Sequence, residues 1–503
     1  MLAATVLGSS MAFIDGTVVN VALPVLQASL SASVSSAQWI IEAYALFLSS
    51  LILVGGSLAD RFGRRRIFSI GIMTFSAGSL ACGLAPGVRW IIAARALQGV
   101  GAALLVPSSL AILGASFPPH ERGRAVGTWS ALTAIATAIG PALGGWLVQV
   151  ASWRAVFFVN LPIAAAVLAI ALWKLPETRN PSDGPLDLGG ALLATVGLGA
   201  LVFGLIEAPG LGWKHPAVWA SLASGTAALA GFVALELRSH HPMIEPALFR
   251  IREFTAANLL TLFLYAALSA TLFFLPFDLI QARGYSPAKA GAAILPLVLL
   301  LFLLSRPAGA LADRLGPRLP LTIGPLIASA GFLLLSLPAG DARHSASPLP
   351  ALCVLGLGMA ITVAPLTATV LNTVDRRDVG AASGINNAVA RVAGLLAVAV
   401  FGIVVSSSFD RALERRLEGP GVSSASRRFL VGERSKLGAM RAPPGAGDAE
   451  RRTIQDAVRS SLASSFQLVS MICGVLALLA SACGAWGLRR TARAGPVGSR
   501  PSA

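Results

Sequence analysis

One eight-residue motif occurs twice in this chain, each time between two long apolar segments. The first copy is Gly56-Ser57-Leu58-Ala59-Asp60-Arg61-Phe62-Gly63, and the second is Gly309-Ala310-Leu311-Ala312-Asp313-Arg314-Leu315-Gly316. Arg64, Arg65 and Arg66 follow the first copy, whereas Pro317 and Arg318 follow the second. A charged turn that joins two membrane helices once in each half of a chain is typical of a membrane fold built by duplication.

Composition independently indicates a membrane protein. Hydrophobic residues make up 55% of the chain and charged residues only 12%, about half the charged share of a soluble domain. The four cysteines lie inside apolar segments, so we expect core residues and neither disulfides nor a metal site. The net charge of +16 does not predict nucleic-acid binding, because the basic residues form short runs without interleaved aromatic residues.

Fourteen segments are long and apolar enough to cross a membrane, which takes roughly 20 residues. The chain enters the first almost at Met1, without a signal peptide, and a truncated or misassigned start stays open. We expect Ser35 and Gln38 to form a capping box ahead of the second segment. The segments cover residues 2–26, 39–59, 67–84, 90–115, 125–150, 153–173, 186–206, 217–237, 256–280, 288–311, 319–337, 349–371, 385–405 and 462–488.

The distribution of basic residues predicts the orientation. An even number of spans places both termini on one side, and the short loops of that side carry most of the Lys and Arg residues. The positive-inside rule therefore predicts a multi-pass protein of the cell membrane with both termini cytoplasmic. The polar stretch 406–460 must then lie outside, and its Arg-, Gly-, Pro- and Ser-rich composition predicts a mobile loop.

The repeat also predicts the organisation. A weaker echo, Gly123-x-Ala125-x-Gly127 against Gly380-x-Ala382-x-Gly384, supports a second half that repeats the first. We expect an all-α membrane protein in which two six-helix bundles are related by pseudo-symmetry, with an inserted two-helix hairpin. The predicted units are a first bundle (1–174), a linker with two extra helices (175–252), a second bundle (253–488) and a cytoplasmic tail (489–503).

Four motifs carry a resemblance over nearly the whole chain. Besides the hairpin motif, they are Asp15-Gly16-Thr17-Val18-Val19-Asn20-Val21-Ala22-Leu23-Pro24, Arg95-Ala96-Leu97-Gln98-Gly99-Val100-Gly101 and Gly140-Pro141-Ala142-Leu143-Gly144-Gly145. Together they resemble the major facilitator superfamily, in its fourteen-span drug:proton antiporter branch. The resemblance implies a proton-driven exporter of small hydrophobic or amphipathic drugs and antibiotics that works by alternating access.

Asp15 and Arg95 are the candidates for proton coupling. Asp15 lies about 20 Å along the first span, where an ionised carboxylate is costly, so we expect it to face a polar cavity. A structural hydrogen bond between helices is the alternative. The resemblance gives Arg95 a role in proton transfer or in holding a buried acid, whereas an arginine that snorkels to the outer surface is the alternative. Gln98 gives Arg95 a polar neighbour.

The two hairpins are the candidate gates. A carboxylate at Asp60 can cap a neighbouring helix and hold the cytoplasmic side of the transporter shut. Gly63 permits the turn, and the arginines after it fix the membrane topology. The resemblance implies gating by the first copy, whereas the second copy departs from the pattern because Pro317 replaces a basic residue. A purely topological basic loop is the alternative. The gating residues are Gly56, Asp60, Arg61, Gly63, Arg64, Asp313 and Arg314.

In the fifth span, Gly140, Pro141, Gly144 and Gly145 predict a broken, thin helix in tight contact with the opposite bundle. An ordinary kinked helix is the alternative. Asn20, Glu42, Gln98 and Asp278 are candidates for binding substrate or protons, although acids at helix ends are also common interfacial residues. Glu207 is a weaker candidate, and we expect Arg306 and Arg391 to snorkel near the cytoplasmic side.

No metal-ligand motif, nucleophile elbow or phosphate-binding loop is present in the sequence. We therefore expect no enzyme, no metal and no cofactor, with the proton gradient as the driving force. The expected partners are the bilayer, a small-molecule substrate and protons, and in a two-membrane bacterium a periplasmic adaptor. A carrier of one specific metabolite and a transporter-like receptor remain the alternatives.

Overall fold

The computed structural model describes residues 1–179, 187–238, 246–338, 347–375, 379–418 and 421–488. Within these ranges every secondary-structure element is a helix, and no β-strand occurs. Thirteen helices are long and apolar enough to cross a membrane, and α2, which is bent between Ile52 and Val54, brings the number to fourteen. The expected all-α membrane fold, with two bundles and an inserted hairpin, is confirmed.

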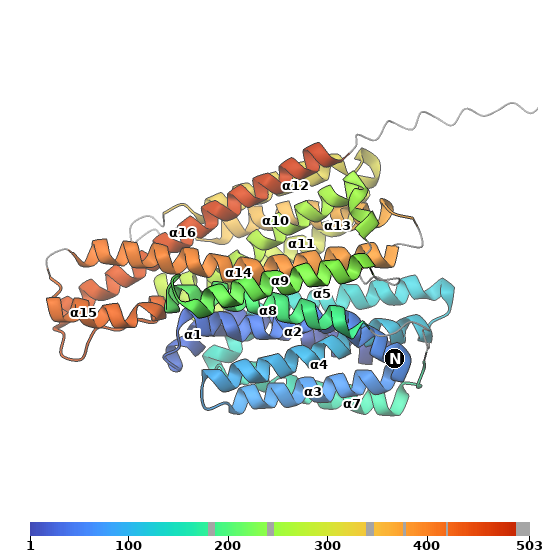
Figure 1. Ribbon diagram of the computed structural model, residues 1–503, viewed down its shortest axis with the longest axis horizontal. Coiled ribbons are helices and arrows are strands. Elements are labelled where there is room, and N and C mark those ends of the chain that lie inside the picture. Colours follow the sequence, from blue (N-terminus) through green and yellow to red (C-terminus); the bar gives the residue numbers. More distant parts are fainter. Residues whose placement is uncertain (180–186, 239–245, 339–346, 376–378, 419–420, 489–503) are drawn as a thin grey trace, which may run out of the picture.

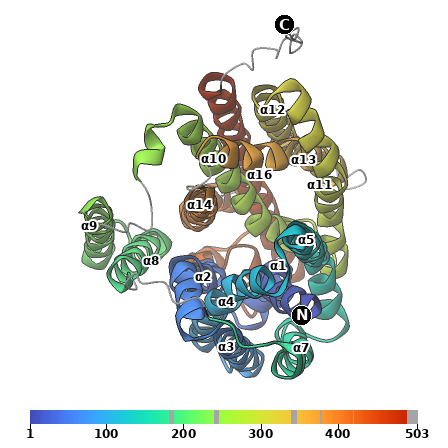
Figure 2. The ribbon, with the colours of Figure 1, turned by 90° about the vertical axis from the view of Figure 1, so that its right-hand side faces the viewer.

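The first bundle lies below the second in Figure 2, and the α8–α9 hairpin stands to one side of both. The first bundle comprises α1 (Leu2–Ser29), α2 (Val34–Phe62), α3 (Arg64–Leu84), α4 (Val88–Ser116), α5 (Pro119–Val150), α6 (Ala155–Phe158) and α7 (Asn160–Lys174). The hairpin comprises α8 (Leu188–Leu211) and α9 (Pro216–Arg238).

The second bundle contains two helices that are much longer than a span (Figure 1). The bundle comprises η1 (Pro246–Arg250), α10 (Arg252–Phe277), the π-helical turn η2 (Asp278–Ala282), α11 (Pro287–Leu315), α12 (Arg318–Leu335), α13 (Leu349–Asn372), α14 (Val379–Leu417), α15 (Ser424–Glu433), η3 (Arg434–Ala439) and α16 (Asp448–Gly487). At 39 and 40 residues, α14 and α16 are each about 60 Å long, roughly twice the hydrocarbon thickness.

The expectation of a loop over 406–460 is wrong, because this segment is largely helical. α14 continues to Leu417 and α16 begins at Asp448. Phe409, Leu413, Ile454 and Val458 are almost fully buried, and their spacing of four residues places each pair on one helix face. This apolar seam is hidden in the sequence by the surrounding charged residues. The predicted tail, 489–503, lies outside the described residues, and the other predicted domain boundaries remain predictions.

The turn between α2 and α3 depends on local backbone chemistry. Gly63 has a φ of 113°, a conformation that side chains with a Cβ rarely adopt. At the other end of α2 the predicted capping box is wrong: Ser33, not Ser35, is the N-cap, and its hydroxyl oxygen accepts a hydrogen bond from the Ser36 N–H at 3.1 Å. The helix still begins as expected for a serine N-cap, with an extended backbone and a side-chain oxygen that accepts a backbone N–H.

The two bundles contact each other closely at the end of the molecule where α5 ends and α11 begins. A Cβ at Gly145 would lie 2.2 Å from the Pro287 carbonyl oxygen, and one at Gly291 would lie 2.1 Å from the Pro141 carbonyl oxygen. Towards the opposite end, Gly127 of α5 and Gly384 of α14 have open space where a Cβ would be. We call the first of these the closed end; the hairpin that carries Asp60 lies at the other.

Candidate functional site

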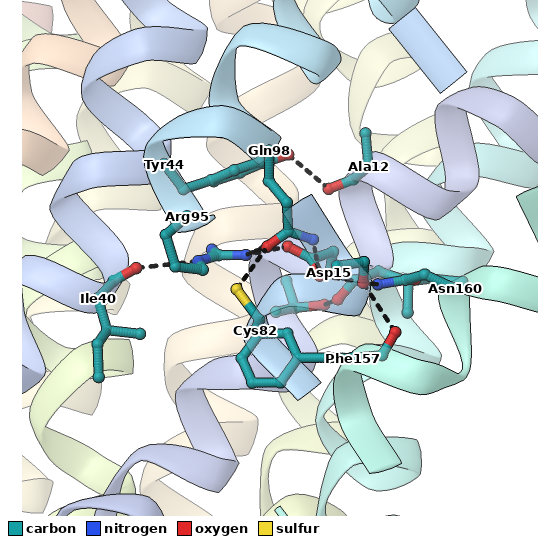
Figure 3. A network of polar contacts seen from close by, with 12 residues as sticks. Ala12, Asp15, Ile40, Tyr44, Cys82, Arg95, Gln98, Phe157 and Asn160 are labelled. Atoms are coloured by element: carbon teal, nitrogen blue, oxygen red, sulfur yellow. Dashed lines mark hydrogen bonds and ion pairs between the residues drawn. The ribbon is translucent and has the colours of Figure 1, made fainter. Parts of the chain in front are cut away.

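A polar network lies inside the first bundle, and the Asp15 carboxylate and the Arg95 guanidinium form its centre (Figure 3). Neither side chain has any exposed surface. Arg95 Nη1 also donates to Gln98 Oε1 at 3.0 Å, and Gln98 Nε2 donates to Asp15 Oδ1 at 3.3 Å. Asp15, Arg95 and Gln98, which the sequence analysis named as separate candidates, are therefore in contact, and Arg95 does not snorkel to a surface.

Three further helices, α2, α3 and α7, complete this network. Asn160 Nδ2 donates to Asp15 Oδ1 at 2.9 Å and to Ser79 Oγ at 3.0 Å, while Arg95 Nε donates to the Ile40 carbonyl oxygen at 2.9 Å. Sequence reasoning missed Asn160. Asn160 is the first residue of α7, and its contact with Asp15 depends on how α7 crosses α1.

The enclosure of Asp15 differs from the expected polar cavity. The Arg95 guanidinium carbon lies 4.3 Å from the centre of the Tyr44 ring, and the Tyr44 hydroxyl donates to the Ala12 carbonyl oxygen at 2.9 Å. The carboxylate is therefore stabilised by an ion pair and hydrogen bonds in place of water. Two buried atoms of the network, Arg95 Nη2 and Asn160 Oδ1, have no hydrogen-bond partner, so the network leaves polar capacity unused.

A cavity of about 380 Å³ lies between the two bundles. Glu42 contributes a carboxylate that is only 1% exposed, and its Oε2 has no hydrogen-bond partner. The buried Oδ1 of Asn20 is also unpartnered. The other residues that line this central cavity are Ile41, Ala45, Ser49, Tyr265, Ser269, Leu272, Phe273, Asn387, Ala390, Arg391, Gly394, Leu395 and Val398.

Arg391 is the largest departure from the sequence interpretation of this region. We expected it to snorkel towards the membrane surface, but it lines the central cavity together with Glu42. Arg306, in contrast, is exposed, as expected. The cavity thus presents one acid, one base, amide groups and aromatic rings, a combination that can bind an amphipathic molecule.

At the first hairpin, Asp60 and Arg64 form an ion pair with 2.6 Å between Oδ1 and Nη2. The neighbouring helix cap, however, comes from Glu177, which the sequence did not identify. Its two carboxylate oxygens accept from the Arg65 and Arg66 N–H groups at 3.1 and 3.2 Å. An acid at the N-terminus of α3 is favourable there because of the helix dipole.

Among the described residues, the remaining gating candidates have fewer contacts that could hold the hairpin in place. Arg61 is exposed, and its guanidinium carbon lies 6.0 Å from the centre of the Phe62 ring; Gly56 faces Pro107. In the second copy, Gly316 also adopts a positive φ, of 79°, and Arg314 is exposed. The side chain of Asp313 lies outside the described residues.

The glycines of the fifth span allow close packing, although the predicted break is absent. α5 continues through Pro141 to Val150. Of these four residues, Gly145 and Pro141 meet the opposite bundle, at α11. Gly140 and Gly144 pack against α1 of their own bundle, where a Cβ would lie 2.0 Å from Thr17 Oγ1 and 2.5 Å from the Val18 carbonyl oxygen.

Two other candidate acids lie away from the central cavity. Asp278 is buried in η2, where its Oδ2 accepts from Arg283 Nε at 2.6 Å. Glu207 lies near the end of α8 and accepts from Trp39 Nε1 at 2.9 Å. The bond from Trp39 accounts for the position of Glu207, whereas Asp278 Oδ1 is buried without a hydrogen-bond partner.

Comparison with known proteins agrees with this architecture. The family model described as Major Facilitator Superfamily matches residues 5–398. The chain is 38% identical over 422 residues to the multidrug resistance protein Stp of Mycobacterium tuberculosis, covering 83% of this chain and 78% of that protein. It is 33% identical over 490 residues to the tetracenomycin C resistance and export protein of Streptomyces glaucescens, covering 96% and 90%.

A solved structure shares the fold. The inward-facing, unoccupied bacterial homologue of the human lysosomal transporter Spinster superposes with a TM-score of 0.65 at 19% identity, over 96% of both chains. With the duplicated hairpin motif, the two bundles around a central cavity and a family match over most of its length, the chain belongs to the major facilitator superfamily.

Proposed function

We propose that this protein is a secondary active transporter that exports small hydrophobic or amphipathic compounds, including antibiotics, in exchange for protons. The central cavity carries this proposal, because it lies between the two bundles and offers both charged and aromatic side chains. The relatives named for drug resistance and export support the direction of transport and the class of compound.

In this proposal the molecule alternates between two arrangements of its bundles. The contact of Gly145 with Pro287 seals the closed end, which the basic-residue distribution predicts to face outwards. The cavity would then load from the cytoplasm. Rocking of the bundles would separate α5 from α11 and release the compound on the other side. Both termini would be cytoplasmic, in the cell membrane.

Coupling is assigned to the Asp15–Arg95 pair. Protonation of Asp15 removes the charge that holds Arg95, and the same guanidinium bonds the carbonyl of Ile40, two residues before Glu42 in α2. A proton on Asp15 would thereby alter α2 where Glu42 meets the cavity, and a compound bound at Glu42 would alter Asp15. This reciprocity is what exchange of substrate for protons needs.

Transport by the purified protein in proteoliposomes tests the proposal. Ethidium should accumulate inside vesicles when a proton gradient is imposed, and a protonophore should abolish the accumulation. Ethidium added without a gradient should move protons in the opposite direction. Absence of gradient-driven movement for a panel of antibiotics and dyes would favour a receptor over a carrier.

A second candidate function is transport of one defined polar metabolite. The presence of both Glu42 and Arg391 in the cavity favours it, since an acid and a base together suit a zwitterion. Competition separates the candidates: an exporter of amphipathic compounds should be inhibited by many unrelated dyes, whereas a metabolite carrier should be inhibited only by close analogues of its substrate.

A further inference from the structure

A second cavity, of about 320 Å³, lies where the α8–α9 hairpin meets both bundles. Figure 2 shows α8 beside α2 and α14, with α9 farther out. We call this cavity the hairpin pocket. The residues that line it are Ser49, Ser50, Gly190, Ala191, Ala194, Leu198, Leu229, Phe232, Val233, Ala381, Gly384, Ile385, Ala388 and Val392. None of them is charged, and only the two serines have a polar side chain.

The pocket occupies one half of the hairpin only. In the other half, α8 packs tightly into the groove between α2 and α14, where Val202, Ile206 and Ala399 are buried together. The bond from Trp39 to Glu207 fastens the same region. Leu46, Leu198 and Leu395 form a second buried cluster, and Leu198 also lines the pocket. The helices therefore separate only towards the end of the molecule that carries the Asp60 hairpin.

The hairpin pocket has an outer side and an inner side. Val233 lines it and is 53% exposed, and its apolar neighbours Leu235 and Leu237 on α9 are exposed as well. Because these helices span a membrane, the surface beside Val233 faces lipid. On the inner side, Ser49 lines both the hairpin pocket and the central cavity.

Ser49, which borders both cavities, can donate a hydrogen bond to a molecule that passes between them. Its Oγ is buried and has no hydrogen-bond partner, whereas the hydroxyl of Ser50 next to it donates to the Leu46 carbonyl oxygen of its own helix at 2.8 Å. A buried hydroxyl without a partner is costly, and a passing molecule with one polar atom would satisfy it.

We infer that the hairpin pocket binds uncharged apolar compounds dissolved in the adjacent membrane leaflet and passes them by Ser49 into the central cavity. An apolar lining without charges selects the body of such a compound and rejects a charged one. The inference rests on the proposed export function, since it assigns to the extra hairpin the intake of the exported compound from lipid.

Filling the pocket tests this inference. Gly384 lines the pocket and has open space for a side chain, so Gly384→Leu should occupy the pocket without disturbing the helix. The matched control is Gly127→Leu, because Gly127 holds the equivalent position of the first-half echo and also faces open space. Nile red, an uncharged dye that dissolves in membranes, and ethidium, a water-soluble cation, serve as probes.

Gly384→Leu should slow the efflux of Nile red by roughly tenfold while ethidium efflux stays close to wild type, as expected for a steric block of one pocket. Gly127→Leu should leave both rates close to wild type. Ser49→Ala should slow Nile red efflux several-fold, roughly the effect of one lost hydrogen bond. Ser76→Ala is the control and should leave the rate close to wild type, because the Ser76 hydroxyl already donates to the Ile72 carbonyl oxygen of its own helix. Equal losses of Nile red and ethidium efflux in Gly384→Leu would overturn the inference.

A binding measurement separates this inference from the function itself. A small apolar aryl diazirine should label Phe232 in vesicles of phosphatidylethanolamine and phosphatidylglycerol. Nile red should prevent this labelling in wild type and in Gly127→Leu. In Gly384→Leu, Phe232 should not be labelled. Labelling that Nile red never displaces would overturn the inference, because lipid chains would then occupy the pocket. Displaceable labelling in a wild type that transports neither dye would instead contradict the proposed export.

Discussion

The Asp15 carboxylate and the Arg95 guanidinium form an ion pair with no exposed surface on either side chain. Breaking such a pair from one side leaves a buried charge without compensation, which typically costs about 3–5 kcal/mol. Protonation of Asp15 would therefore require a new partner for the Arg95 charge, and this is the property that the proposed coupling depends on.

Asp15→Asn should abolish gradient-driven accumulation and substrate-induced proton release, because the neutral form is then fixed. It should also lower thermal stability, since Arg95 loses its counter-charge. Asp15→Asn/Arg95→Gln should recover much of the stability without recovering the coupling. The measurements are pH change in proteoliposomes and thermal unfolding of the purified variants. Normal accumulation by Asp15→Asn would move the proton site elsewhere, with Glu42 and Asp278 as the next candidates.

Glu42→Gln should reduce ethidium transport by roughly tenfold or more, because in the proposed function this carboxylate binds the cation in the central cavity. Glu207→Gln is the control: that carboxyl group only accepts a bond from Trp39, and an amide oxygen can replace it. Ethidium uptake at several concentrations would show the loss chiefly as a higher KM. Equal effects of both variants would remove Glu42 from the binding site.

Gly145→Leu should force the closed end open, because even a Cβ would lie 2.2 Å from the Pro287 carbonyl oxygen. The Ala288 N–H donates to Gln149 Oε1 across the bundles at 3.3 Å. Cysteines introduced at these two positions, in a variant without the native cysteines, should therefore form a disulfide. Gly145→Leu should suppress that disulfide and Gly127→Leu should not. An undiminished disulfide would show that α5 and α11 separate without involving Gly145.

Asp60→Asn and Glu177→Gln should have different effects. Glu177→Gln weakens the cap of α3 and should lower the free energy of unfolding by about 1 kcal/mol. Asp60→Asn should reduce transport at near-normal membrane abundance, as a gate residue would. Abundance and transport measured on the same membranes distinguish the two. A loss of abundance in Asp60→Asn that matches its loss of transport would make that residue a folding residue.

Reporter fusions should place Arg65 and Arg490 in the cytoplasm and a site within residues 432–447 outside. The basic residues of the short loops predict this orientation, and Arg490 lies outside the described residues. A cytoplasmic signal from 432–447 would change the number of spans by one and place the helices beyond Leu417 on the inner side.

The sequence predicted the fold and singled out Asp15 and Arg95 because both inferences depend on local signals. Apolar length identifies spans, and an acid or a base inside a span requires a partner, as Asp15 and Arg95 provide for each other. Asn160 and Glu177 could not be identified in this way, since their roles depend on where α7 and the residues after it cross α1 and α3. Arg391 was misjudged for a related reason: position along a span does not reveal which face of α14 borders the cavity.

The helical segment beyond Leu417 reaches back to the membrane part of the protein. Gln27 of α1 donates to the Lys436 carbonyl oxygen of η3 at 3.2 Å, while Gln281 of η2 donates to Gln27 Oε1 at 3.0 Å. η3 is thus tied to a residue that itself joins the two bundles. One such bond contributes about 1 kcal/mol, or roughly a fivefold change in the ratio of two conformations. A protein that lacked this segment would spend a larger fraction of each transport cycle with its closed end open, and would release its cargo and reset with different timing.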